Sequence, residues 1–440
     1  KQPRTQDMAT RRRTAGRKQR WTQQTILYRG ILFAMAVVLG KFLFPSPSGP
    51  CVSDDAIESP FGSTAVHPCE CFSETYLEAR TKFRQAATEQ GAQLFELAIY
   101  QNYTTDIAYL PNPNSKDLVV HTSGVHGIEG YAGSAIQIAL LKSVQFADKG
   151  TTTIPSLLLI HAVNPYGMAH YRRFNENNVD LNRNGIHDFA TVRARDPNLA
   201  HYVDFDQQFN PTQPYRFGFI MELLPVLLRH GLGHLKQAMV TGQYHKPSGV
   251  FYGGGGELES SNAQLYNFTK TFLQDIHPTQ TSSSLDSKTT WINVHTGLGP
   301  HGMDTILFGA EGLGGGGVCD AIREEVAKVF HTSLVPGATG GDVVQEGYSL
   351  MQGSTEQLIQ PLFSSSPDEQ EHRNDWFLTQ EFGTIPSILV GRAMILENRM
   401  HHHPTSTEDA SIGASLLKTA FYPQTPKWRR AILTQGLRLA

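Results

Sequence analysis

The chain has 440 residues, of which 40% are hydrophobic and 18% charged, with 40 Gly and 24 Pro. This apolar content supports a sizeable core and excludes a wholly disordered or fibrous chain. Ten of the 37 Lys and Arg lie in residues 1–50 against the single acid Asp7, so residues 51–440 hold 27 basic and 39 acidic residues, a net charge of −12. Such an acidic body lacks the clustered cations that phosphate contacts need, so no nucleic-acid partner is expected.

The N-terminal residues combine a basic arm, 1–25, with an apolar stretch, 26–44. The uninterrupted part of this stretch, 30–40, is closer in length to the core of a signal peptide than to a spanning helix of roughly 20 residues, so 26–44 is a signal peptide or a signal anchor. With Lys41 at its edge, 26–44 could just cross a bilayer. No clear small-x-small cleavage site follows, so we predict a signal anchor with a transmembrane helix, in a membrane-anchored protein or one in the lumen of the secretory pathway. The Arg-rich, acid-poor arm leaves a mitochondrial or plastid presequence as the alternative.

Residues 45–72 are rich in Pro, Ser and Gly and are predicted to be a linker, with the folded body beginning near Phe72. From there helical patterns alternate with short β-rich runs, which favours an α/β layered fold. Helices are predicted over 74–91 and after Tyr131, and strands at 94–100, 118–122, 157–162, 290–295, 305–308 and 387–390.

The four cysteines are too few for a fold built on disulfides. In an oxidising lumen Cys51 could pair with Cys69 or Cys71, and otherwise all three are free thiols. Cys319 lacks a specific local partner and is expected to be a core thiol.

Two phrases place candidate metal ligands at the ends of β-rich runs. In HTSGVHGIEGYAGSAIQ, His126 and Glu129 stand at positions i and i+3 just before a helix. Residues three apart share one face of a helical turn, so this imidazole and carboxylate can meet one cation. The alternative is that both are polar residues of a Gly-rich loop. In WINVHTGLGPHG, His295 ends a strand-like run, and His301 is the alternative ligand farther into the loop.

Two further phrases carry charged groups suited to hydrolysis. NPYGMAHYRRFNENNVDLNRNG brings Arg172, Arg173 and Arg183 together with Asn182 after a strand. Guanidinium forks bind oxygens bidentately, so the cluster suits recognition of a carboxylate or stabilisation of an oxyanion, with a solvated basic loop as the alternative. In TQEFGTIP, Glu381 precedes a turn. A carboxylate that is not a ligand but lies beside a metal-bound water is what hydrolysis requires.

Taken in this order, the phrases SGVHGIEGYAGSAIQ, RRFNENNVDLNRN and TQEFGT resemble the zinc carboxypeptidase superfamily. They are most similar to its branch known only as a domain of unknown function and related to succinylglutamate desuccinylase and aspartoacylase. The resemblance spans roughly residues 72–399 and implies a three-layer α/β/α fold with a mixed, twisted central sheet. We expect a catalytic domain over 73–425 with an inserted cap around 186–290, followed by a C-terminal tail over 426–440.

The resemblance also implies a catalytic centre. Zinc would be bound by His126, Glu129 and His295, with water in the open fourth position. Glu381 matches the family's general base, and Arg173 matches the arginine that stabilises the oxyanion.

Around this centre the resemblance implies contacts to the substrate. Asn182 and Arg183 match the pair that holds its terminal carboxylate, and Asp180 matches the acid that orients the first zinc histidine. The tyrosine that closes over the substrate has no secure match, and Tyr348 is the candidate. The sequence thus predicts a zinc-dependent hydrolase that cleaves an amide bond, of the metallocarboxypeptidase or N-acyl amino acid deacylase type. Its substrate would be a small peptide or an N-acyl amino acid with a free carboxylate.

Two other classes stay open, a non-catalytic binding protein on the same fold and a dinucleotide-binding enzyme. Gly312, Gly314 and Gly317 form a G-x-G-x-x-G between a strand-like and a helix-like run, but no acidic residue ends a second strand about 20 residues on. The sequence has no G-x-S-x-G and no H-E-x-x-H, which disfavours serine hydrolases and thermolysin-like enzymes. The three histidines 401–403 are expected to form a surface cluster, because adjacent imidazoles cannot all face one site.

Overall fold

The computed structural model describes a set of segments that all belong to one unit, Cys51–Ala440. Among these described residues no helix is both long enough and apolar enough to cross a bilayer. The prediction of a membrane-anchored protein with a transmembrane helix is corrected by this finding, and residues 1–25 and 26–44 themselves lie outside the described part. The described residues are 56–58, 65–144, 154–216, 218–277, 287–308, 320–330, 333, 352–363 and 375–439.

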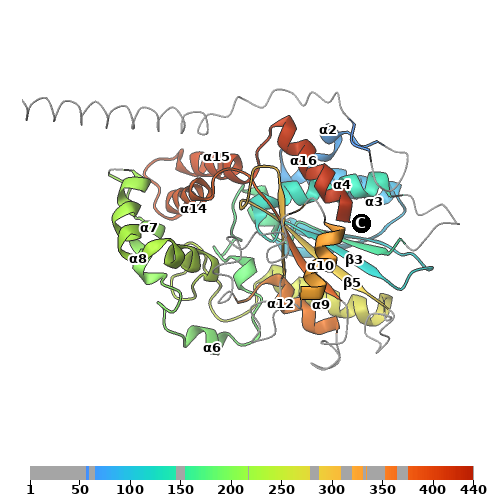
Figure 1. The fold of residues 1–440 in the computed structure, drawn as a ribbon, viewed down its shortest axis with the longest axis horizontal. Coiled ribbons are helices and arrows are strands. Elements are labelled where there is room, and N and C mark those ends of the chain that lie inside the picture. The colour runs from blue at the N-terminus through green and yellow to red at the C-terminus, as the bar shows by residue number, and fades with distance from the viewer. Residues whose placement is uncertain are drawn as a thin grey trace, which may run out of the picture. The chain divides into compact units, whose positions relative to one another are not determined.

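A seven-stranded mixed sheet with the order β1-β2-β4-β3-β5-β7-β6 runs through this unit (Figure 1). The four central strands β4, β3, β5 and β7 are parallel, whereas β1, β2 and β6 pair antiparallel to their neighbours. The carboxyl ends of the parallel strands therefore meet at one edge of the sheet. The strands are β1 Gln93–Tyr100, β2 Tyr103–Leu110, β3 Leu118–Ser123, β4 Ser156–His161, β5 Thr289–Thr296, β6 Asp304–Phe308 and β7 Trp376–Phe382.

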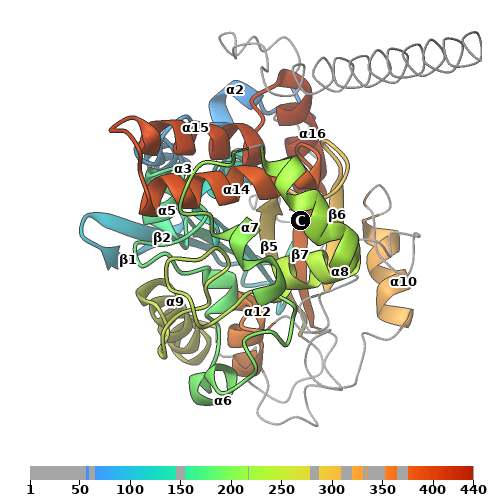
Figure 2. The same ribbon diagram turned by 90° about the vertical axis from the view of Figure 1, so that its left-hand side faces the viewer.

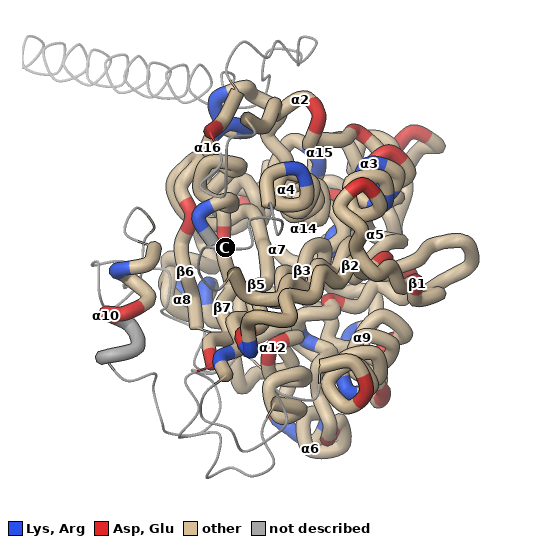
Figure 3. Tube along the Cα trace, turned by 90° about the vertical axis from the view of Figure 1, so that its right-hand side faces the viewer, with Lys and Arg blue, Asp and Glu red and all other residues tan. Residues whose placement is uncertain are grey.

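Helices cover both faces of the sheet. Figure 3 shows the strands between α3, α4 and α16 on one side and α9 and α12 on the other, which confirms the predicted three-layer α/β/α fold. These helices are α3 Tyr76–Glu89, α4 Gly130–Ser143, α9 Ser260–Thr271, α12 Thr355–Ile359 and α16 Pro426–Gly436. The other helices of the described segments are α2 Pro68–Cys71, α5 Pro165–Ala169, α6 Phe189–Arg193, α7 Asp206–Phe209, α8 Phe219–Thr241, α10 Asp320–Val329, α14 Ser387–His402 and α15 Asp409–Phe421.

The two helical layers enclose two hydrophobic cores because side chains alternate across the strands. In β4, Leu157 and Leu159 enter the core beneath α3 and α4, whereas Leu158 and Ile160 enter the core beneath α9 and α12. Every residue of β4 is buried, as expected for a strand covered on both faces. Burial of each such leucine contributes about 1.5–3 kcal/mol relative to exposure.

Five of the six predicted strands are present, but the strand predicted at 387–390 is wrong. These residues form the first turn of α14, which begins after Pro386. The short run SILV is apolar enough for either element, and the following buried positions Val390, Ala393 and Met394 have the spacing of a helix face. Strands β2 and β7 have no counterpart among the predicted elements.

The cysteines of the described segments differ in state. Cys69 is disulfide-bonded, whereas Cys71 is a free, buried thiol. Burial raises the pKa of Cys71 to about 12, which keeps this thiol protonated at neutral pH. Cys51 and Cys319 lie outside the described residues.

Candidate metal centre

The turn after β3 delivers His126 and Glu129 to the carboxyl edge of the sheet. Gly124 follows β3 with a φ of +71°, in a region that residues with a Cβ rarely adopt. A 3-10 turn, Gly127–Glu129, then carries Glu129 into the start of α4. The i, i+3 spacing expected from the sequence is thus set by one tight turn between strand and helix.

Backbone hydrogen bonds hold the loop that carries Arg172 and Arg173 against this turn. The N–H of Gly127 donates to the carbonyl of Arg173 (3.1 Å), and the N–H of Ile128 donates to the carbonyl of Arg172 (2.8 Å). A Cβ at Gly127 would lie 2.1 Å from the carbonyl carbon of Gly167. Only a glycine allows this approach, so the ligand turn and the arginine loop are held together.

Strand pairing brings His295 and Glu381 together from distant parts of the chain. His295 is the penultimate residue of β5, Glu381 is the penultimate residue of β7, and the register pairs the two directly. Neighbouring strands lie about 4.8 Å apart, and paired residues project to the same face of the sheet. The Leu298 N–H donates to Glu381 Oε1 (2.9 Å) and so fixes this carboxylate at the edge.

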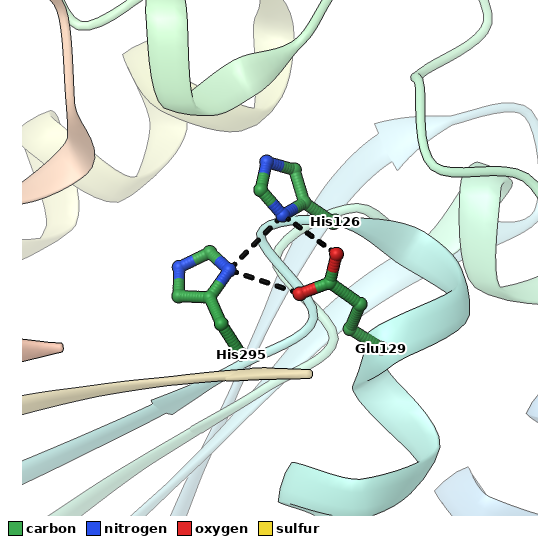
Figure 4. Close-up of side chains that lie close together, drawn as sticks. All are labelled: His126, Glu129 and His295. Carbon is green, nitrogen blue, oxygen red and sulfur yellow. Dashed lines mark hydrogen bonds and ion pairs between the residues drawn. The ribbon is translucent and has the colours of Figure 1, made fainter. Parts of the chain in front are cut away.

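His126, Glu129 and His295 form a compact buried group whose nitrogen and oxygen atoms point toward one another (Figure 4). His126 Nδ1 and His295 Nδ1 lie 3.0 Å apart, and each is 3.0 Å from one oxygen of Glu129. The Thr296 N–H also donates to Glu129 Oε2 (3.0 Å). Within the described segments these three residues are the group that could hold a metal ion.

Asp180 and Arg173 contact the metal-ligand group and orient its side chains. Asp180 Oδ1 lies 3.0 Å from His126 Nε2, so the imidazole presents Nδ1 to Glu129 and His295. Arg173 donates from Nε and Nη2 to Asp180 Oδ2 (3.3 and 3.2 Å) and from Nη1 to Glu129 Oε1 (2.8 Å). The guanidinium therefore bridges the ligand carboxylate and the orienting carboxylate.

The electrostatics of these buried carboxylates differ. Burial opposes ionisation of Glu129, but His126, His295 and Arg173 together outweigh it and hold the pKa of Glu129 well below its ordinary range. Burial likewise opposes ionisation of Asp180, whose pKa Arg173 and His126 keep low. By contrast, burial and the nearby negative charge of Glu129 raise the pKa of Glu381 to about 7. The site thus separates two ionised carboxylates from one suited to exchanging a proton near neutral pH.

Asn182 and Arg183 lie beside this group on a short 3-10 turn, Leu181–Arg183. Asn182 Oδ1 accepts from the Thr355 N–H (3.1 Å), and Arg183 Nη1 donates to the Asn182 carbonyl (2.9 Å). Arg183 is buried, its Nε has no hydrogen-bond partner, and no carboxylate of the described segments lies within ion-pair distance of it. A buried guanidinium in this state can receive an anion.

A cavity of about 350 Å³ opens beside the metal-ligand group. Polar side chains of the site form part of its wall, and α8 and α14 supply most of the apolar wall. Figure 2 shows α8 beside α14, and an added Cβ at Gly391 would lie 3.0 Å from Met239 Cε, so the two helices are in contact. The polar residues lining the cavity include His126, Arg173, Asn182, Arg183, His295, Glu356, Thr379 and Glu381.

Glu356 and Thr379 belong to this wall but are not predicted from the sequence. Glu356 is 1% exposed and accepts a hydrogen bond from Thr379 Oγ1 (3.1 Å). Thr379 stands two residues before Glu381 and so lies on the same face of β7. This alternation would identify Thr379 from the sequence only if β7 were already known to be a strand. Glu356 lies on the short helix α12, and nothing in its local sequence marks it.

Other candidate residues lie away from the metal-ligand group. His301 is exposed, with Nδ1 2.5 Å from the Thr384 carbonyl. Arg172 is not a solvated loop residue, because it is buried and donates to Glu397 on α14 (2.7 Å). Tyr348 and the G-x-G-x-x-G at 312–317 lie outside the described residues.

The chain resembles several solved structures at low sequence identity. No curated protein matches the chain. The solved structures that resemble it include a bovine thrombin-activatable fibrinolysis inhibitor bound to tick carboxypeptidase inhibitor, at 13% identity and a TM-score of 0.43 over 80% of this chain and 97% of that one. A carboxypeptidase A from Helicoverpa armigera matches at 12% identity and 0.43 (89% and 81%), and a metallo-carboxypeptidase from Burkholderia cenocepacia at 12% and 0.34 (77% and 66%).

The family assignment comes from the sequence itself. Residues 72–435 match the family model described as "Protein of unknown function (DUF2817)". The match begins where the folded body was expected to begin and takes in all four phrases that carry the candidate residues. This confirms the expected branch, and the chain belongs to the DUF2817 family of proteins of unknown function.

Proposed function

We propose that the protein is a zinc-dependent hydrolase that cleaves an amide bond in small substrates carrying a free carboxylate, either peptides or N-acyl amino acids. One observation carries the proposal. The buried group of His126, Glu129 and His295 lies at the wall of a cavity, with Glu381 paired in register beside His295. Two imidazoles and one carboxylate form the donor set of hydrolytic zinc sites, and a further carboxylate that is not a ligand acts there as the general base.

The chemistry of the donors fits zinc. Two nitrogens and one carboxylate suit Zn²⁺, whereas Ca²⁺ and Mg²⁺ prefer oxygen ligands. Glu129, Asp180 and Glu381 are buried close to Arg173, and with these four groups ionised their summed charge would be −2. A bound divalent cation would offset this charge. When bound, zinc would polarise the amide carbonyl and activate water near neutral pH.

The residues of this chain would then divide the remaining work. Glu381, held by the Leu298 N–H, would accept a proton from water and pass it to the leaving amine. Arg173 would place positive charge at the cavity wall, where negative charge develops on the carbonyl oxygen. Arg183 and Asn182 would bind the free carboxylate, which the unpaired Nε of Arg183 supports.

The test uses the full chain and measures metal content and hydrolysis together. About one zinc per chain is expected in the wild type, and this zinc should be lost in a His126→Ala/His295→Ala double variant. With N-acetyl amino acids and dipeptides as substrates, Glu381→Gln should retain zinc but lose roughly 10²–10⁴-fold in activity. Zinc binding without hydrolysis would favour a non-catalytic binding protein, and failure of the wild type to bind offered zinc would refute the proposal.

A further inference from the structure

The wall of the cavity changes character away from the metal-ligand group. Gly297 stands two residues after His295, and an added Cβ there would lie 3.0 Å from Phe421 Cε1 and 3.5 Å from Val390 Cγ1. The apolar wall therefore begins directly beside a candidate ligand. From there the cavity is lined by one face each of α14 and α8, whose contributions are apolar apart from Ser387 and Lys236.

The cavity is larger than the site chemistry needs. An apolar cavity of about 150 Å³ holds one benzene molecule. Scaled by volume, the 350 Å³ cavity holds roughly fourteen non-hydrogen atoms. In an acylglycine the carboxylate, the α-carbon and the amide account for seven of these atoms, which leaves room for roughly seven further chain carbons, or an acyl group of about eight carbons.

The apolar lining selects between the two proposed substrate types. Each additional residue of a peptide brings one N–H and one C=O into the cavity, and both need partners when buried. The faces of α8 and α14 offer such groups almost nowhere. A hydrocarbon chain has no such requirement, and each of its methylenes gains from leaving water.

Helix α8 also provides an apolar route from the cavity to solvent. Leu232 lines the cavity and is also 60% exposed, so the cavity reaches the surface at this side chain. Leu224 and Leu228, which precede it on the other side of a kink in α8, are 43% and 79% exposed. Gly231 interrupts α8 next to Leu232 with a φ of +84°. An apolar chain that exceeds the cavity would therefore emerge beside Leu232.

We infer that the cavity under α8 binds the acyl chain of the substrate, so that the protein acts on N-acyl amino acids with an unbranched chain of roughly eight carbons or more. This inference rests on the proposed hydrolase function and specifies its substrate. The free carboxylate of the amino acid lies at Arg183, and the chain runs between α14 and α8.

The test compares N-acetyl-, N-hexanoyl- and N-decanoylglycine on the zinc-loaded full chain, because glycine leaves chain length as the single variable. The value of kcat/KM should rise about threefold to fourfold per methylene until the cavity is filled. Peptides of matched length should be poorer substrates than decanoylglycine. If acetylglycine is hydrolysed and chain length has no effect, or if the peptides are preferred, this inference is overturned while the hydrolase stands.

Cavity-filling variants locate the effect. Leu235→Trp narrows the cavity from α8, and Ile388→Trp narrows it from α14 at a side chain that is 37% exposed and so tolerates substitution. Either should lower kcat/KM for decanoylglycine at least about tenfold and leave acetylglycine within about twofold. The matched control is Leu77→Trp on α3, the same substitution at a leucine that is 66% exposed and does not line the cavity, and it should change neither substrate.

Calorimetric binding of decanoate and acetate separates the two proposals. If no acylglycine is hydrolysed but decanoate binds and Leu235→Trp abolishes its binding, the hydrolase fails and the chain-binding cavity is supported. If decanoate binds no more tightly than acetate, the inference is overturned.

Discussion

Replacing Asp180 by Asn tests whether the network behind the metal-ligand group sets its metal affinity. The carboxylate accepts from His126 Nε2 and the Asn182 N–H on Oδ1, and from Arg173 on Oδ2. An asparagine can keep one acceptor oxygen toward His126, but its NH₂ group then meets the donors of Arg173. The substitution therefore removes a negative charge and creates a donor–donor contact in a buried place.

Both consequences have expected magnitudes. Loss of the partner that orients a ligand histidine lowers metal affinity about 10–100-fold, or about 1.4–2.8 kcal/mol. Breaking the buried pair between Asp180 and Arg173 should cost about 3 kcal/mol of unfolding free energy in the metal-free protein.

The assay is zinc affinity by competition with a chelator, alongside urea unfolding of the metal-free protein. The control is Asp196→Asn, the same chemical change at an exposed carboxylate whose partner among the described residues is the Asn198 N–H. It should leave both quantities unchanged. Wild-type zinc affinity in Asp180→Asn would refute the orienting role, and an unchanged unfolding free energy would refute the importance of the buried pair.

Three further predictions concern pH and packing. Burial raises the pKa of Glu381 to about 7 without metal. A bound cation stabilises the ionised form and so lowers this pKa below 7. In a pH–rate profile, kcat/KM of the zinc-loaded protein should therefore fall on acidification through a pKa below 7. Burial lowers the pKa of His161 to about 4 from 6.5, so this histidine should lower the free energy of unfolding by about 2 kcal/mol from pH 7 to pH 5. Urea unfolding of His161→Met should show a smaller loss over this pH range. Equal losses in both proteins would contradict the burial of a neutral His161. Gly127→Ala forces a Cβ against the Gly167 backbone and should destabilise by about 1–3 kcal/mol, whereas Gly233→Ala, which meets nothing within 4 Å, should not; equal unfolding midpoints would refute the close approach.

The ligand residues were accessible from the sequence because each is marked locally. His126 and Glu129 share one turn, and their i, i+3 spacing is visible without a structure. His295 ends a strand-like run, and Glu381 is marked by the turn that follows it. What the sequence could not show is that β5 and β7 are neighbours, because β7 has no counterpart among the predicted elements and strand order depends on packing across the sheet.

The helix at 387–402 shows the limit of local patterns. Its first four residues, Ser-Ile-Leu-Val, have the composition of a strand, and only the burial of Val390 and Met394 on one face reveals a helix. That face is also a wall of the cavity. An error in assigning this element therefore hides half of the apolar site.

The other half is hidden for a different reason. Helix α8 carries leucines at both buried and exposed positions, since Leu235 is buried while Leu228, on the other side of the kink at Gly231, is 79% exposed. Periodicity cannot tell a face that meets a core from one that meets a ligand or solvent, because all are built from the same leucines. Only the position of α8 across from α14, beside the Arg183 guanidinium whose Nε has no partner among the described residues, gives its inner face a chemical meaning. The residues that would perform the reaction are marked by motif, whereas those that would choose the substrate are marked by packing alone, so chain-length dependence is the more demanding test.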